Sequence, residues 1–150
     1  MKQDNLPSLS LFRHHTPVQL RFNDVDVLGH VNNTVYFSFY DTGKAYYFNA
    51  VRGRMQSWKH VDTVIANVNC SYLNSIVFGD EIEVLTRCVA IHEKSFLLQQ
   101  MLVRLPEKTV MSVCDTVMVF FDPDTHHSKP LDETFRRQLC EYEGHDLSQK

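Results

Sequence analysis

The chain has 150 residues, of which 43% are hydrophobic, and its formal net charge is −3 with the histidines neutral. This length suits a single domain with a sizeable core, and the slightly acidic balance argues against a nucleic-acid partner or an anionic membrane surface. No apolar run is long enough to span a bilayer, and the N-terminus lacks the apolar segment of a secretory signal. The four cysteines contain no C-x-x-C pair, so the sequence predicts a cytoplasmic protein with reduced thiols and no metal centre.

The N-terminal part of the chain predicts an arm, a strand and a long helix. Residues 1–16 are mostly polar with little periodicity, which predicts a mobile arm. Val18–Phe22 alternates apolar and polar residues, as a half-buried strand does. Asn32 or Asn33 can cap the helix that follows, because an Asn side chain accepts from the free N–H groups of a first helical turn.

The expected helix has one apolar face, and that face includes a glycine. Its members recur at spacings of four, three, four and three: Tyr36, Tyr40, Gly43, Tyr47 and Ala50. A glycine inside a helix costs about 1 kcal/mol relative to alanine, so we expect Gly43 to mark a close approach of the helix to a sheet. Gly53 is placed to end the helix.

Four strand patterns and a short helix make up the rest of the chain. The strands are expected at Thr63–Ser75, Glu81–His92, Ser95–Leu105 and Thr109–Phe121. Residues 123–150 form a C-terminal extension in which Asp132–Tyr142 predicts a short amphipathic helix. Long antiparallel strands around one helix indicate a single domain, residues 1–150, of the α+β class.

The stretch from Arg21 to Asn33 carries the chemistry. Asp26 lies a few residues before the helix N-terminus, with Gly29 between them. Helix N-termini present unpaired N–H groups and partial positive charge, which can polarise an acyl oxygen close to an acid that attacks it or activates water. The sequence therefore predicts an acyl-transfer site here, with Asp24 in a structural role, in turn hydrogen bonds or paired with Arg21.

The same stretch carries a family resemblance. The run Arg21-Phe22-x-Asp24-x-Asp26-x-x-Gly29-His30-Val31-Asn32-Asn33, then Tyr36, Tyr40 and Asp41, resembles the hotdog-fold thioesterases of the 4-hydroxybenzoyl-CoA thioesterase type. The resemblance continues through Asn69-Cys70-Ser71-Tyr72, Phe78-Gly79-Asp80 and Lys94-Ser95-Phe96, so that it covers roughly residues 18–122. It implies a hotdog fold, in which a curved antiparallel sheet wraps a long central helix, and acyl-CoA thioesterase activity.

The resemblance also implies roles for individual residues. Asp26 is the catalytic nucleophile or general base, and Asn33 is the best donor for the oxyanion. The implied substrate-binding residues are Gly29, His30, Val31, Asn32, Tyr36, Asn69, Lys94 and Ser95. Simpler structural interpretations remain open for several of them: Asp26 as a turn cap, His30 as a turn residue, Tyr36 as core, Asn69 on a solvent face and Lys94 in a hairpin.

The resemblance implies an acyl thioester as the small-molecule partner, with coenzyme A as part of the substrate and no metal or redox cofactor. It also implies a homodimer or homotetramer whose active sites form between subunits. Two alternatives remain open: the carrier is acyl carrier protein, or the chain binds acyl thioesters without hydrolysing them. A hotdog hydratase fits less well, because its D-x-N-P-x-H motif is absent and Asp26 and His30 are one residue too close.

Overall fold

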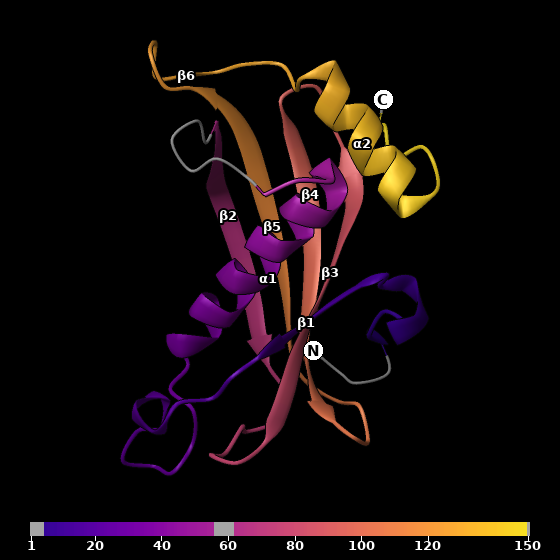
Figure 1. Ribbon diagram of the computed structural model, residues 1–150. Coiled ribbons are helices and arrows are strands. Elements are labelled where there is room, and N and C mark those ends of the chain that lie inside the picture. Colours follow the sequence, from indigo (N-terminus) through magenta and orange to yellow (C-terminus); the bar gives the residue numbers. More distant parts are fainter. Residues whose placement is uncertain (1–4, 56–61, 150) are drawn as a thin grey trace.

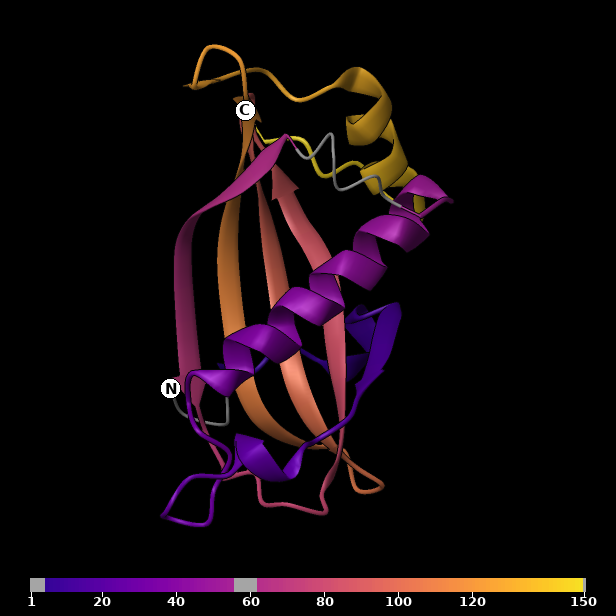
Figure 2. The same cartoon turned by 60° about the vertical axis from the view of Figure 1, so that its left-hand side comes forward.

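The computed structural model describes residues 5–55 and 62–149. A five-stranded antiparallel path runs in the order β1-β3-β4-β5-β2, with the short β6 (His127–Ser128) paired to the end of β5. One long helix, α1 (Val35–Arg52), lies diagonally across the concave face of this curved sheet, and α2 (Glu133–Glu143) packs near one end of the sheet (Figures 1 and 2). The prediction of an α+β hotdog fold is therefore confirmed.

The four long strands begin and end close to where the sequence places them. They are β2 (Thr63–Tyr72), β3 (Glu81–Ile91), β4 (Ser95–Leu105) and β5 (Thr109–Asp122). Alternating apolar residues between strong turn residues mark such strands well. β2 is interrupted by a bulge between Ile65 and Asn67, which reverses the alternation of its side chains there.

The first strand lies earlier in the chain than predicted. β1 is His14–Val18 and pairs only with β3, whereas Phe22 begins a short 3-10 helix and is 77% exposed. Pro17 lies inside β1, and proline is tolerated there because β1 is an edge strand. The predicted arm of residues 1–16 is also shorter than expected, since Leu9–Leu11 forms a 3-10 helix and Phe12 is buried.

Helix α1 is seated tightly on the sheet at Gly43. A Cβ added to Gly43 would lie 2.5 Å from Val84 Cγ1, which confirms the expected close approach. Gly53 ends the helix with φ of 67°, as predicted. Two helix positions differ from the predicted face: Lys44 is buried and Ala50 is exposed, so the buried stripe lies slightly to one side of the predicted one.

The two faces of the sheet are covered differently. Two hydrophobic clusters fill the space between the sheet, α1 and α2, and Leu131, Phe135 and Leu139 join one of them, so the C-terminal helix is confirmed. On the opposite face the N-terminal segment lays Phe12 over β3, β4 and β5. No helix in the described part of the chain has the length and apolarity to cross a membrane.

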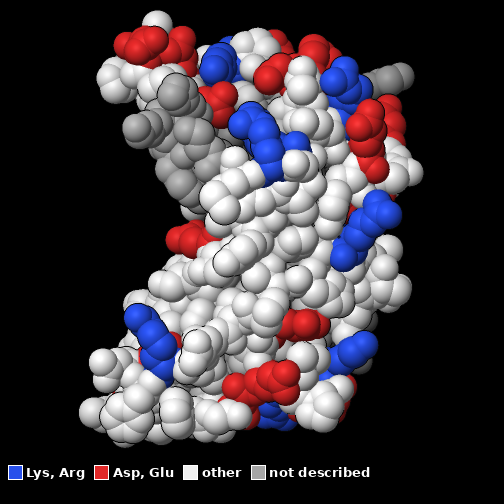
Figure 3. All heavy atoms as spheres, in the orientation of Figure 1, with Lys and Arg blue, Asp and Glu red and all other residues white. Residues whose placement is uncertain are grey.

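The face shown in Figure 3 carries charges of both signs near its ends, with a largely uncharged stretch between them. No patch of a single sign dominates this face.

Candidate active site

A tight loop immediately before α1 forms one side of the candidate site. Val25 and Val31 form an isolated antiparallel bridge that closes the loop. Within it, the Asp26 N–H donates to the His30 carbonyl and the Gly29 N–H donates to the Asp26 carbonyl, both at 3.0 Å. Gly29 has φ of 80°, a conformation that favours glycine, so this residue allows the chain to reverse.

Asp26 is held by this loop and is partly buried. Its Oδ1 accepts from the Leu28 N–H at 2.9 Å, and its Oδ2 accepts from the Asn32 side-chain amide at 3.4 Å. Asp26 therefore caps the turn, as the simpler interpretation expected. A carboxylate has about four lone-pair sites, so these two donors leave lone pairs that can accept from a water or attack a substrate carbon.

Asp24 serves the fold, as the sequence analysis predicted. Its side chain is buried, and its oxygens accept from the Arg21 N–H at 2.8 Å and from the Arg21 guanidinium at 2.9 Å. The Asp24 carbonyl also accepts from the Asn32 N–H at 2.9 Å. These contacts fix the loop on which Asp26 is carried.

The backbone amides from Gly29 to Asn33 are not all available to a ligand. The Gly29 N–H is used in the turn, the Val31 N–H donates to the Ile76 carbonyl at 2.8 Å, and the Asn32 N–H donates to Asp24. The amides of Val31 and Asn32 are therefore already paired within the protein, in the bridge and in the loop. Within residues 5–55 and 62–149, no protein group accepts from the N–H of His30 or Asn33.

Asn32 prepares the helix start rather than binding a ligand. Its Oδ1 accepts from the N–H of Thr34 at 2.9 Å and from the Thr34 hydroxyl at 2.6 Å. Thr34 is the residue that precedes the helix, and Asn32 does not accept from the N–H groups of the first helical turn, so the predicted capping by an asparagine is wrong; Asn32 instead orders Thr34, two residues further on.

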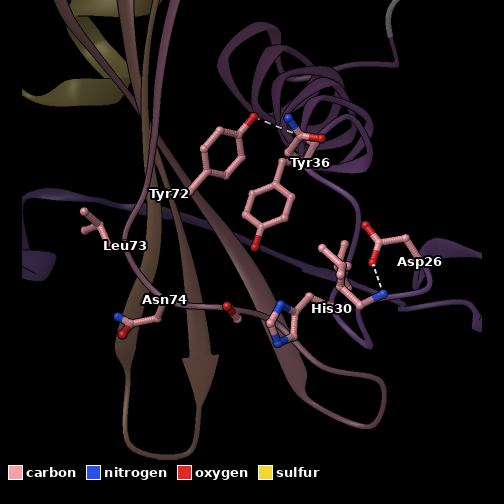
Figure 4. A pocket seen from close by; sticks show the side chains of 10 residues that line it. Asp26, His30, Tyr36, Tyr72, Leu73 and Asn74 are labelled. Carbon is pink, nitrogen blue, oxygen red and sulfur yellow. Dashed lines mark hydrogen bonds between the residues drawn. The ribbon is translucent and has the colours of Figure 1, made fainter.

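A pocket of about 270 Å³ lies beside Asp26 and the start of α1. The helix side supplies Asp26, Leu28, His30, Val31, Asn33 and Tyr36, and the end of β2 supplies Tyr72, Leu73, Asn74 and Ser75. In the view of Figure 4, Asp26 and the β2 residues lie on opposite sides, with His30 and Tyr36 between them. The pocket thus joins segments that are about forty residues apart, whose meeting depends on the sheet.

Two tyrosines form the inner wall. The rings of Tyr36 and Tyr72 meet edge to face with centroids 4.8 Å apart, and the Tyr72 hydroxyl donates to the Asn33 carbonyl at 3.1 Å. Burial raises the pKa of Tyr36, and burial together with the nearby Cys70 raises the pKa of Tyr72 to about 12. Both phenols therefore keep their protons at neutral pH, and Tyr72 stays a donor that holds the peptide between Asn33 and Thr34, just before α1.

Leu73, Asn74 and Ser75 were not predicted as site residues, and no role was predicted for Tyr72. These residues follow a strand pattern and contain no catalytic motif. The available signal was the resemblance at Asn69-Cys70-Ser71-Tyr72, which ends where the pocket wall begins.

Five predicted substrate-binding residues do not line this pocket: Gly29, Asn32, Asn69, Lys94 and Ser95. Asn69 pairs with Asp115 and points to the sheet face opposite α1, because the adjacent pair Cys70 and Cys114 belongs to the α1 side. Lys94 and Ser95 lie at the turn between β3 and β4, where Ser95 pairs with Val119 at the far end of the sheet. A single chain therefore does not bring Asn69, Lys94 or Ser95 to Asp26. Gly29 shapes the loop without lining the pocket.

The pocket is weakly charged. Among its ten lining residues, Asp26 is the one carboxylate, and there is no lysine or arginine. In the described part of the chain, no three His, Cys, Asp or Glu side chains gather as they would around a metal ion. An acid, two unused amides and tyrosine walls suit attack on a polarised carbonyl.

The fold and this loop together define a protein of the hotdog class with an acid placed at the start of its central helix. A sequence model of the thioesterase-like superfamily matches residues 20–139, and the chain belongs to that superfamily. The prediction of a family of thioester hydrolases with a hotdog fold is thereby confirmed.

Individual relatives agree with this assignment. A Thermus thermophilus thioesterase, solved with coenzyme A and zinc, is 27% identical with a TM-score of 0.82, covering 93% of this chain and 100% of that one. The Pseudomonas 4-hydroxybenzoyl-CoA thioesterase shares the fold at 19% identity with a TM-score of 0.74, covering 83% and 97% of the two chains.

Two curated proteins also match. The Escherichia coli long-chain acyl-CoA thioesterase FadM is 24% identical over 83% of this chain and 95% of its own length. The uncharacterized Bacillus subtilis protein YsmA is 28% identical, and that match spans 58% of each chain.

Proposed function

We propose that this protein hydrolyses acyl-coenzyme A thioesters to the carboxylic acid and free coenzyme A. The observation that carries the proposal is the presence of the Asp26 carboxylate and the unused Asn33 N–H on one pocket at the start of α1. The family and the relatives solved with coenzyme A or named for acyl-CoA substrates support the choice of substrate class.

In the proposed reaction, the acyl oxygen accepts from the Asn33 N–H, with the neighbouring His30 N–H as a second donor. Negative charge that develops on this oxygen is stabilised by amides that are already oriented. Asp26 then acts in one of two ways. It attacks the carbonyl, giving a mixed anhydride and the coenzyme A thiolate, and water hydrolyses the anhydride; or it takes a proton from a water molecule that attacks directly.

We also propose that the working form is a homodimer or a larger assembly of such dimers. β2 is an edge strand with exposed Val64, Ile65 and Val68, and an unpaired apolar edge needs a partner. Antiparallel pairing of β2 with its copy would bring the turn between β3 and β4 of one chain towards the pocket of the other. Lys94 and Ser95 of the partner subunit could then meet the phosphates of coenzyme A, for which the pocket itself supplies no cation.

The test is hydrolysis of a panel of aryl and aliphatic coenzyme A thioesters, followed by the loss of thioester absorbance. Asp26→Asn keeps the shape and the acceptor oxygen but removes the nucleophile or base, so we expect kcat to fall about 10²- to 10⁴-fold. Glu141→Gln, which neutralises a remote surface carboxylate, is the matched control and should keep wild-type kcat. Full activity in Asp26→Asn would reject the assigned residue.

The same panel separates the alternatives. If the wild type binds acyl-CoA but hydrolyses none of the panel, a binding protein becomes the better explanation. If it hydrolyses thioesters of acyl carrier protein with a higher kcat/KM than those of coenzyme A, its natural substrate is an acyl group carried on acyl carrier protein. Turnover in ¹⁸O-labelled water distinguishes the two routes, because label in the Asp26 carboxylate arises only through the anhydride.

A further inference from the structure

Two cysteines face each other across β2 and β5, on the side of the sheet that α1 covers. Cys70 and Cys114 are direct register partners, and both contact the hydrophobic cluster that includes Tyr36 and Tyr40. The Leu73 N–H donates to the Met111 carbonyl at 2.9 Å, which makes that register pair a hydrogen-bonded one. Pairs alternate along an antiparallel ladder, so the pair three residues earlier, Cys70 and Cys114, is of the non-hydrogen-bonded type.

This pair type brings side chains close together. Its Cα atoms lie about 4.5 Å apart, within the range that a disulfide bond spans. All four cysteines are free thiols, and Cys70 is partly buried while Cys114 is buried. The geometry therefore allows a cross-strand bond without any rearrangement of the sheet.

A buried hydroxyl chain ends at the sulfur of Cys70. The Tyr40 hydroxyl donates to Ser112 Oγ at 2.7 Å, and Ser112 Oγ lies 3.5 Å from Cys70 Sγ. Tyr40 and Ser112 are both fully buried, so their hydroxyl groups must find partners within the protein. Because Ser112 accepts from Tyr40, its own O–H is left to donate to Cys70, and a thiolate is the form of sulfur that accepts best.

Other neighbours favour the same charge state. Hydrogen bonding to Cys114 is the main cause that lowers the pKa of Cys70 to about 6, with smaller contributions from Ser112 and the ammonium of Lys44, against the effect of burial. The Lys44 side chain is 8% exposed and is paired with Asp41 at 3.4 Å. The shared proton stays on Cys114, whose pKa is raised by the bond to Cys70 and by burial.

We propose that Cys70 is a hydroperoxide-reactive thiolate and that Cys114 is its resolving thiol. Hydrogen peroxide transfers an oxygen to the Cys70 thiolate, which becomes a sulfenic acid as hydroxide leaves. The Cys114 thiol then attacks the sulfenic sulfur, forming the disulfide and releasing water. In total, two thiols are oxidised to one disulfide and one hydrogen peroxide is reduced to two molecules of water, with the two thiols supplying the two protons. A reducing thiol reverses the bond.

The modification lies apart from the proposed hydrolytic chemistry. Cys70 does not line the pocket beside Asp26, although Tyr72, two residues further along β2, does. The proposal therefore stands whether or not the chain hydrolyses acyl-CoA, and it can be tested without a thioester.

The test treats the intact wild-type protein with hydrogen peroxide at pH 7, blocks remaining thiols and maps disulfide-linked peptides by mass spectrometry. We expect the Cys70–Cys114 link as the first product, removed by dithiothreitol. Cys88 is the internal control, since burial raises its pKa to about 12, and it should stay reduced. Alkylation of Cys70 by iodoacetamide should follow a titration with its midpoint near pH 6.

Two variants separate the roles of the pair. In Cys114→Ala the sulfenic acid at Cys70 has no resolving thiol, so a dimedone adduct should accumulate there. In Cys70→Ala no adduct should appear at Cys114. The proposal is rejected if peroxide leaves Cys70 reduced in the wild type, or if Cys140 reacts before it. The mapping of disulfides in the wild type needs no substitution, so it tests the proposal even if one of the variants fails to fold.

Discussion

Replacement of Gly43 by alanine tests how closely α1 is seated on the sheet. A Cβ at this position would lie 2.5 Å from Val84 Cγ1 and 3.0 Å from Gln100 Nε2. The first distance is far below ordinary van der Waals contact, and Val84 is fully buried, so it has little room to move. Either the helix lifts from the sheet, or Val84 and Gln100 shift together.

The expected cost follows from three contributions. Alanine in place of glycine favours the helix by about 1 kcal/mol. Overpacking a filled core costs about 1–3 kcal/mol. Gln100 Nε2 donates to the Tyr40 carbonyl and to Thr86 Oγ1, each at 3.0 Å, and displacing it leaves buried acceptors unpaired at about 1–3 kcal/mol. The net loss in the free energy of unfolding is therefore about 3 kcal/mol, within a range of about 1–5 kcal/mol.

Urea unfolding followed by circular dichroism measures this loss directly, and thermal unfolding should show a fall of about 6–12 °C. Thr42→Ala is the matched control, because it adds the same residue on the exposed side of the same helix and should change stability by less than about 0.5 kcal/mol. If Gly43→Ala were as stable as the wild type, the close approach of α1 to β3 would not exist in solution.

Three further changes probe the core, the pocket wall and an N-terminal histidine. Tyr40→Phe leaves the buried Ser112 hydroxyl without its donor, so the free energy of unfolding should fall by about 1–2 kcal/mol in urea titrations. Tyr72→Phe removes the donor to the Asn33 carbonyl and should lower kcat/KM for acyl-CoA by less than about tenfold, without loss of stability. Burial lowers the pKa of His14 below 6.5, so the unfolded chain binds a proton at a higher pH than the folded chain does, and the free energy of unfolding should fall as the pH drops below 6.5. His14→Gln should reduce this loss, which is measured as the difference between urea midpoints at pH 7.5 and 5.5.

The strands and the central helix could be predicted because their signals are local. Alternation bounded by Gly, Pro and charged turns placed four strands to within about three residues, and Gly43 and Gly53 had the roles expected of them. β1 was missed because Pro17 weakens a strand pattern, and only the position at a sheet edge makes it acceptable. The burial of Lys44 was also not predicted from the sequence, because it results from the diagonal crossing of α1 over the sheet.

The candidate site divides in the same way. The loop from Asp26 to Asn33 is contiguous, so its residue types were sufficient to predict an acid before a helix start. The opposite wall comes from the end of β2, and its position depends on the pairing of Tyr72 with Ser112 across the sheet. Asn69 was expected to reach a site formed between subunits; within one chain, the alternation of β2 turns it to the sheet face opposite α1.

The choice of oxyanion donors shows what coordinates add to a motif. From the sequence, the resemblance favours the Asn33 amide and leaves its neighbours from Gly29 onwards as further candidates. In the structure, the turn uses the Gly29 amide, and the bridge and loop use those of Val31 and Asn32. Each of those bonds holds the loop closed, so none can be given to a substrate without opening it. The amides of His30 and Asn33 have no partner among the described residues, so an oxygen that bound them would break none of the hydrogen bonds that hold the loop closed.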